Sequence, residues 1–194
     1  QTIVAGTYGK ALDARFRRVA QAPAWGHSHF LQGGESGGAL LDLHIHDVDF
    51  LQYCFGRPQA VFASGYSKVS GAVDHVLALY QFPDGPTVSA EGSWAMTEGF
   101  GFTMAFTVNF ERATVDFDSG RGADAMRLIA QGVSAATLKP DGGDGYIGEL
   151  KHFVECVQSG KVPSVGTPED GGAAVTLCEA EEESIRTGKL VSLS

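Results

Sequence analysis

The pattern of hydrophobic and polar positions changes along the chain from a helix-forming stretch to a β-rich middle and back to helices. Residues 39–55 are mostly helix formers, and Gly56 with Pro58 supplies a stop signal, so one helix is expected there. Short β-rich runs follow, separated by turn sequences such as Pro83-Asp84-Gly85-Pro86. The expected strands are 60–69, 75–82, 87–96, 102–110 and 113–118, preceded by one at 11–20. Consecutive strands with short connections indicate antiparallel pairing.

The last third is expected to end in two helices. After a Gly-rich passage at 119–145, residues 146–158 and 168–187 have the apolar spacing of helices, the second closed by Gly188, and a last strand is expected at 189–193. Strands segregated from helices predict one α+β domain over residues 1–194, with a large, mostly antiparallel open-faced sheet and helices packed on one face.

The first predicted helix carries the most informative polar pattern. At about 100° per residue, four polar side chains fall within roughly 60° of one another, with apolar residues opposite: Asp42, His46, Asp49 and Tyr53. An imidazole beside a carboxylate is the arrangement of a general base, because the carboxylate orients the ring and stabilises the imidazolium. A solvated helix face with an exposed Asp–His pair explains the same spacing and stays an alternative.

Charged residues away from this stripe are expected to be structural. His44 faces the apolar side of the helix, which favours a buried core or interface histidine. Asp47 is predicted to be a solvated or capping charge, and the acidic cluster at 179–183 a solvated helix face.

Composition narrows the classes of partner. A chain of 194 residues with 43% hydrophobic content can build a packed core. With 14 basic against 23 acidic residues, the net charge of −9 disfavours nucleic acid and anionic membrane as partners. Three cysteines lie far apart in apolar stretches, which indicates buried thiols in a reducing compartment and predicts a cytoplasmic protein. No stretch reaches the ~18 consecutive apolar residues of a membrane-spanning helix.

Two regions of the chain carry motifs of one family. The first contains Gly37, Gly38, Asp42, His46, Asp49 and Gly56; the second contains Gly145-Tyr146, Glu149-Leu150, Phe153, Gly160, Pro163, Ser184 and Gly188. In this order and separation they resemble the second domain of the Gfo/Idh/MocA oxidoreductases, a family that includes glucose-fructose oxidoreductase and inositol dehydrogenases. His44 departs from the pattern, since relatives commonly have Gly there.

The resemblance implies a role for the polar stripe. It implies that His46 transfers a proton and that Asp42 assists it at the substrate. The chain is then the substrate-binding and oligomerisation domain of an enzyme that uses NAD or NADP to oxidise or reduce a secondary alcohol of a sugar, cyclitol or related polyol. A homo-oligomer, either a dimer or a tetramer formed through the sheet face, is also implied.

Three further residues are candidate substrate contacts. Asp49 belongs to the stripe, Trp25 could stack on a sugar face, and Arg17 could bind an anionic substrate group. Arg15 and Arg17 share one side of their strand, so a solvent-facing pair stays open, as does an ordinary packing role for Trp25.

A dinucleotide-binding domain is not found in this sequence. The single GxGxxG string, formed by Gly143, Gly145 and Gly148, does not follow a buried strand, so it is predicted to be a loop and the start of a helix. The chain also begins with Gln1 rather than Met. We therefore expect it to be part of a longer protein whose N-terminal Rossmann domain binds the cofactor, and to be inactive alone.

Two other functions compete with this interpretation. The His44-Ile45-His46 segment also resembles the start of metal-dependent amidohydrolases, where both imidazoles bind a metal that activates water. That fold needs a barrel of ~250 residues, longer than this chain. A stand-alone, non-catalytic binding or assembly module of the same fold is the other alternative.

Overall fold

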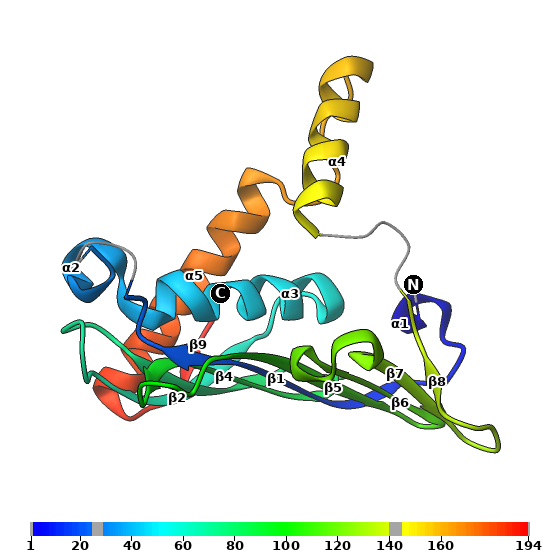
Figure 1. Ribbon diagram of the computed structural model, residues 1–194, viewed down its shortest axis with the longest axis horizontal. Helices are drawn as coiled ribbons and strands as arrows, with labels where there is room; N and C mark the ends of the chain where they lie inside the picture. The colour runs from blue at the N-terminus through cyan, green and yellow to red at the C-terminus, as the bar shows by residue number, and fades with distance from the viewer. Residues whose placement is uncertain (1, 25–28, 140–144, 194) are drawn as a thin grey trace.

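One nine-stranded sheet forms the base of the molecule in the computed structural model, which describes residues 2–24, 29–139 and 145–193 (Figure 1). The strands lie in the order β8-β7-β6-β5-β1-β4-β3-β2-β9. Their bounds are β1 (Ala11–Gln21), β2 (Ala60–Tyr66), β3 (His75–Gln81), β4 (Thr87–Met96), β5 (Phe102–Phe110), β6 (Ala113–Asp118), β7 (Met126–Ala130), β8 (Ala136–Thr137) and β9 (Val191–Ser192). The predicted α+β class with a mostly antiparallel open sheet is confirmed.

The sheet departs from a simple meander at β1. This first strand lies in the middle, antiparallel to β5 and parallel to β4, with Phe16 opposite both Phe106 and Ala90. The β1–β4 pair is the one parallel ladder among the described strands. Strands β7 and β8 lie within the Gly-rich passage for which no element was predicted. The sheet is therefore wider than the sequence pattern indicated.

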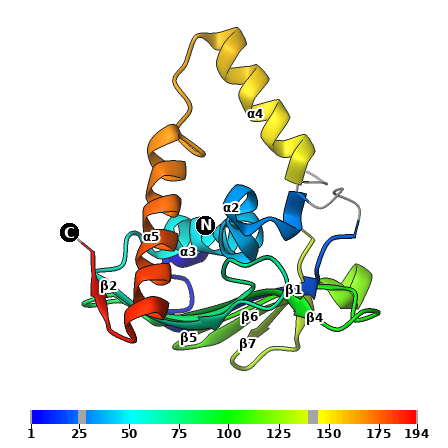
Figure 2. The same ribbon diagram turned by 90° about the vertical axis from the view of Figure 1, so that its left-hand side faces the viewer.

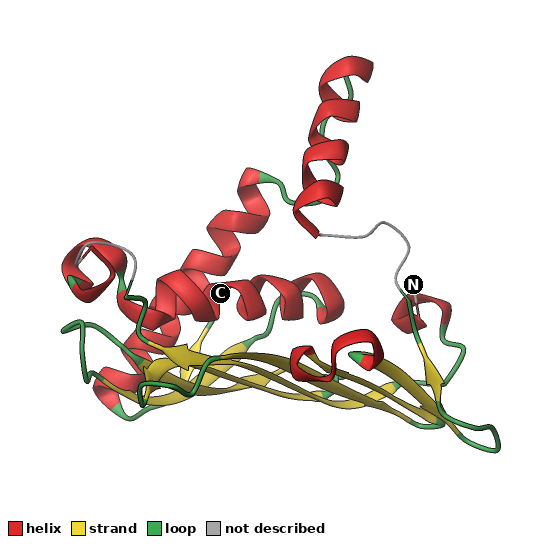
Figure 3. Cartoon of the chain, in the orientation of Figure 1, coloured by secondary structure: helices red, strands yellow, loops and turns green. Residues whose placement is uncertain are grey.

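The helices rise from one side of the sheet and leave the other side without a helix (Figure 3). They are α1 (Thr2–Ala5), α2 (Gly33–Ser36), α3 (Ile45–Phe55), α4 (Gly145–Ser159) and α5 (Pro168–Thr187), with a π-helical turn η2 (Leu40–His44) and two 3-10 turns, η1 (His29–Leu31) and η3 (Ser119–Asp124). None of those in the described part of the chain combines the length and apolarity needed to cross a bilayer.

Helix α5 has sharp ends that follow from its sequence. At its start, the Thr167 hydroxyl accepts a hydrogen bond from the Asp170 N–H, and the Asp170 carboxylate accepts one from the Thr167 N–H. Pro168 occupies the first turn, where its missing N–H costs nothing. At the other end, Gly188 takes a left-handed conformation with φ 66°. The predicted helix at 168–187 is confirmed.

The core lies between the sheet and the inner faces of α3 and α5. Val48 and Leu51 of α3 and Leu177 of α5 pack against sheet residues such as Phe16. Burial of these apolar faces stabilises the layer, since each fully buried aliphatic or aromatic side chain contributes about 1.5–3 kcal/mol. The helix that carries the polar stripe is thus fixed from below by packing.

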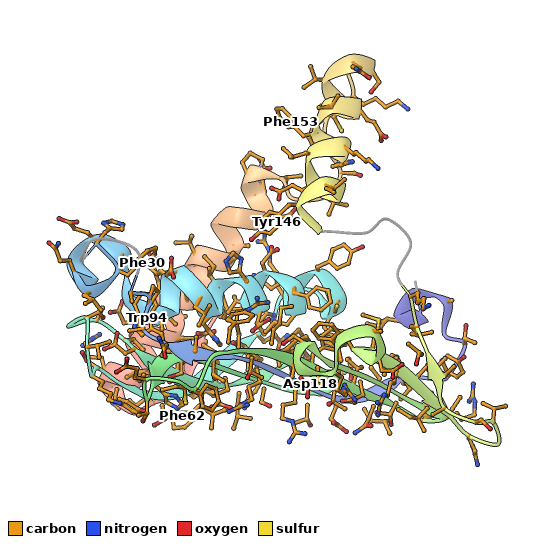
Figure 4. All side chains as sticks on the ribbon, viewed as in Figure 1. Phe30, Phe62, Trp94, Asp118, Tyr146 and Phe153 are labelled. Atoms are coloured by element: carbon orange, nitrogen blue, oxygen red, sulfur yellow. The ribbon has the colours of Figure 1, made fainter. Side chains whose placement is uncertain are left out.

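Helix α4 differs from the others because it stands away from the sheet (Figure 2). None of its described side chains is buried, and its apolar residues, among them Leu150 and Phe153, are 64% and 62% exposed. Tyr146 and Phe153 project from it in Figure 4.

Candidate active site

The predicted helix at 39–55 is present, but it begins with an unexpected π turn. The Ile45 N–H bonds the Leu40 carbonyl, five residues back, and closes η2; α3 then continues to Phe55. Such wide turns are rare and occur often at functional sites. Here the turn contains Asp42 and ends two residues before His46.

The structure places the predicted stripe on the outer side of this helix. His46 and Asp49 are exposed and Asp42 is half-buried, whereas Val48 and Leu51 are buried beneath them. Among the described residues, none forms a side-chain hydrogen bond with Asp42 or His46. Both groups are therefore free to contact a ligand.

The two carboxylates of the stripe interact electrostatically with the same imidazole. Burial raises the pKa of Asp42 above its ordinary value of 3.8, and His46, followed by His29, opposes this rise. Burial also raises the pKa of Asp49, as does the negative charge of Asp170, while His46 again opposes the rise. Both carboxylates of the stripe therefore lie close enough to His46 to interact with it electrostatically.

Two hollows flank the helix. Asp42 lines one of about 490 Å³, together with Trp94, Phe102 and residues 20–24 at the end of β1. Asp49 lines another of about 460 Å³, together with Tyr53, Arg57 and Asp170 at the start of α5. Both volumes lie within the ~300–1,000 Å³ range of small-molecule sites. The stripe therefore contributes to two adjacent recesses rather than to one.

The buried side of the helix carries ionisable residues as well. His44 is completely buried, which confirms the expected core histidine, and its Nε2 lies 3.0 Å from Glu181 Oε2 of α5. Asp47 is 3% exposed and pairs with Arg18 of β1 at 2.9 Å. The prediction of solvated charges was wrong for Asp47 and for Glu181, because each is buried against a partner distant in sequence.

The remaining candidates have different outcomes. Trp25 lies outside the described residues. Arg17 pairs with Glu91 at 2.9 Å, and because side chains alternate along a strand, it faces the side of the sheet opposite to Arg18 and the helix. The structure therefore does not bring Arg17 together with Asp42 and His46.

Trp94 forms part of the wall of the Asp42 hollow, a role that was not predicted from the sequence. Trp94 Nε1 donates a hydrogen bond to Asp74, and the indole packs edge-on against Phe30 at 6.1 Å between ring centres. Figure 4 shows Trp94 and Phe30 on the helix side of the sheet. The signal was present, since Trp94 lies near the end of a predicted strand, but sequence does not reveal which strand ends meet.

The geometry does not favour a metal site at His44 and His46. One imidazole is fully buried against Glu181 and the other is exposed on the opposite side of the helix. Within residues 2–24, 29–139 and 145–193, no group of three or more His, Cys, Asp or Glu side chains is arranged to hold a metal ion.

Comparisons with known proteins agree with the fold and the motifs. The chain is 29% identical over 204 residues to the scyllo-inositol 2-dehydrogenase (NAD(+)) of Bacillus subtilis (strain 168), covering 98% of this chain and 57% of the relative. It is 28% identical over 173 residues to the myo-inositol 2-dehydrogenase of Thermotoga maritima, covering 81% and 50%. The chain thus spans about half the length of these relatives.

Solved structures show the same fold at low identity. The apo form of levoglucosan dehydrogenase superposes with a TM-score of 0.85 at 19% identity, covering 100% of this chain and 62% of that one. The aldose-aldose oxidoreductase from Caulobacter crescentus gives 0.81 at 21%, covering 99% and 58%. The family model described as the GFO/IDH/MocA C-terminal domain matches residues 1–116, more than half of the sequence. The chain therefore belongs to the GFO/IDH/MocA family.

Proposed function

We propose that the chain is the substrate-binding and catalytic part of an NAD- or NADP-dependent oxidoreductase. Its substrate is a secondary alcohol of a sugar, cyclitol or related polyol. The main supporting observation is that Asp42 lines a hollow of about 490 Å³ whose wall includes Trp94, and that His46 is exposed four residues further along; neither side chain forms a hydrogen bond with the described residues. An aromatic wall beside polar groups suits a polyol ring, which has apolar C–H faces and a polar rim. The names of the inositol dehydrogenase relatives support this class of substrate.

In the proposed reaction His46 accepts the hydroxyl proton of the alcohol. The carbon–hydrogen bond breaks as the carbonyl forms, and a bound nicotinamide supplies the acceptor for the hydride. Asp42 stabilises the imidazolium produced, and Asp49, which is coupled electrostatically to the same ring, adds to this stabilisation. In the reverse direction the His46 imidazolium returns the proton to the alkoxide oxygen.

The described residues do not form a site for the phosphates of a dinucleotide. Helix α4 starts at Gly145 within the GxGxxG string, but the preceding strand β8 is a two-residue edge strand paired antiparallel to β7. No strand–turn–helix–strand unit of the dinucleotide type occurs among the described residues. Residues 143 and 144 of the string lie outside the described residues. We therefore place the cofactor mainly on residues outside this chain, in agreement with the greater length of the relatives.

The test measures turnover by the full-length protein from which this chain is expected to come. It is supplied with NAD⁺ or NADP⁺ and with scyllo-inositol, myo-inositol or levoglucosan. His46→Ala should lower kcat roughly 10²- to 10⁴-fold, the usual contribution of a general base, with little change in cofactor affinity. The matched control is His152→Ala on α4, which should keep wild-type turnover. Normal turnover of His46→Ala would refute the base assignment. Polyol binding without oxidation by the wild type would favour the stand-alone binding module.

We also propose that the protein is a homo-oligomer, a dimer or tetramer, formed through the helix-free face of the sheet. Phe62 and Leu79 lie opposite each other on β2 and β3, with Leu77 beside them, and all three are 40–49% exposed. Phe62 points away from the helix side in Figure 4. Leu79→Glu should convert the species seen by sedimentation velocity to a monomer, whereas Val133→Glu, an exposed residue at the β7–β8 turn, should not. A monomeric wild type at micromolar concentration would contradict the proposal.

A cytoplasmic location is proposed from the thiols. Cys54, Cys156 and Cys178 are all unpaired, as expected in a reducing compartment.

A further inference from the structure

A cluster of three buried polar side chains lies directly beneath the polar stripe. It joins His44 at the end of the π turn, Tyr80 of β3 and Glu181 of α5, and none of the three is more than 3% exposed. Tyr80 Oη donates to Glu181 Oε1 at 2.7 Å. Because the single phenolic proton is used in that bond, the 3.3 Å contact between His44 Nε2 and Tyr80 Oη requires Nε2–H as the donor.

The cluster is closely fitted to its surroundings. Gly92 of β4 lies against the imidazole, and a Cβ at this position would be 2.5 Å from the Cβ of His44. Glu181 Oε2 lies 3.0 Å from His44 Nε2. Among the described residues, neither this carboxylate oxygen nor His44 Nδ1 has a hydrogen-bond partner. Burial, together with the neighbouring Glu181 carboxylate, raises the pKa of Tyr80 well above 10, so the phenol stays protonated. The three side chains therefore find their polar contacts in one another.

Helix α5 holds both ends of the π turn. Glu181 contacts His44 at the last residue of η2, and Cys178 Sγ lies 3.9 Å from the Leu40 carbonyl at its first residue. The same carbonyl accepts the Ile45 N–H that closes the turn. Cys178 and Glu181 are three residues apart and so lie on one face of α5. In the sequence, Asp42 lies between Leu40 and His44, the two contacted residues, and His46 follows His44 by two residues.

We propose that the His44–Tyr80–Glu181 cluster positions the π turn and, through it, Asp42 and His46. The three are positioning residues of the active site, and their effect on turnover rests on the proposed function. A purely structural role does not require these side chains, because well-packed apolar residues stabilise a core at least as well as a buried ionic cluster. The cluster instead holds the backbone at His44 in one conformation. His44 lies two residues from Asp42 and two residues from His46.

The test uses two conservative variants of the protein as encoded, assayed with NAD⁺ and scyllo-inositol. Glu181→Gln keeps the volume and removes the charge, and Tyr80→Phe removes only the hydroxyl. Each should lower kcat roughly 10- to 100-fold with KM little changed, the usual consequence of small misplacement of catalytic groups. Circular dichroism at the assay temperature verifies that each variant is folded. The matched control is Glu91→Gln, which breaks a partly exposed pair with Arg17 on the opposite sheet face and should keep wild-type kcat.

A second measurement separates positioning from stability and does not need activity. With ¹⁵N-labelled histidine, the NMR titration of the His46 ring should shift in Glu181→Gln and stay unchanged in Glu91→Gln. Wild-type kcat and an unchanged His46 titration in both cluster variants would overturn the proposal, even if their melting temperatures fall. Full turnover of His46→Ala would instead overturn the proposed function, and the His46 titration would still decide whether the cluster positions the turn.

Discussion

Asp74 is a buried residue whose carboxylate closes the loop between β2 and β3. Its Oδ2 accepts the backbone N–H groups of Lys68, Val69 and Ser70 at 2.6–3.0 Å. Its Oδ1 accepts the Ser70 hydroxyl and the indole N–H of Trp94. The residue is completely buried. Asp74 therefore holds both a loop and a wall of the Asp42 hollow.

These contacts set the dependence of stability on pH. Burial alone raises the pKa of Asp74, but hydrogen bonds from Ser70, Val69 and Lys68 outweigh it and lower the pKa from 3.8 to about 2. At about 1.4 kcal/mol per pH unit, the difference is worth about 2 kcal/mol of folding free energy. Because the folded pKa is the lower one, this stability is fully present above the unfolded pKa. It is lost as the pH falls from about 4 towards 2.

Urea unfolding of wild type and Asp74→Asn between pH 7 and pH 2 measures this contribution. Above pH 5 the variant should be less stable by about 2 kcal/mol, and the difference should shrink as the pH approaches 2. Fluorescence of Trp94, measured in a Trp25→Phe background, should also change in Asp74→Asn. The matched control is Asp118→Asn, since the partly exposed Asp118 accepts one backbone N–H from Gly120 at 2.8 Å and should matter much less. A constant difference between wild type and Asp74→Asn at every pH would show that the bonded carboxylate is not responsible.

Asp47→Ala leaves the Arg18 guanidinium without its partner and should lower the free energy of unfolding by about 3 kcal/mol; a urea midpoint equal to wild type would contradict this. Gly92→Ala places a methyl group against His44 and should cost about 1–3 kcal/mol in the same assay; unchanged stability would mean that the imidazole can move. Burial raises the pKa of the half-buried Cys54 to about 11, so in a Cys156→Ala background this thiol should react with Ellman's reagent at pH 8 much more slowly in the folded protein than in urea, and equal rates would contradict the raised pKa.

The strands and long helices could be predicted because their signals are local. Alternation located β2 to β6 within a few residues, and the Thr167 cap with Gly188 bounded α5. The central place of β1 could not be predicted in this way, because its partners β4 and β5 lie some 70 to 100 residues further along the chain. The π turn was also inaccessible, since its residues are ordinary helix formers and its ends contact α5, more than 130 residues later.

Asp47 and Glu181 show a different kind of failure, because their burial was encoded locally. Asp47 is three residues after His44 and four before Leu51, both buried, which is the spacing of one helix face. Glu181 follows Leu177 by four residues and precedes buried Ser184 by three. Charge led to the prediction of solvated residues, because acidic side chains are rarely buried without a partner. A charge at an apolar position of a helix pattern is better interpreted as evidence for a distant partner.

The two arginines at the centre of β1 show how strand register determines which side chain reaches the candidate site. Arg17 and Arg18 are neighbours, so they project to opposite faces of the sheet. Arg17 was selected as a substrate contact, yet it pairs with Glu91 on the helix-free face, whereas Arg18 reaches α3 and holds Asp47, the residue next to His46. Which arginine serves the site is decided by the register of β1 against β4, and a shift of one residue would exchange them. Register is fixed by the buried positions Ala14 and Phe16 on the helix face. The packing of apolar residues therefore determines which cation pairs with Asp47 on helix α3.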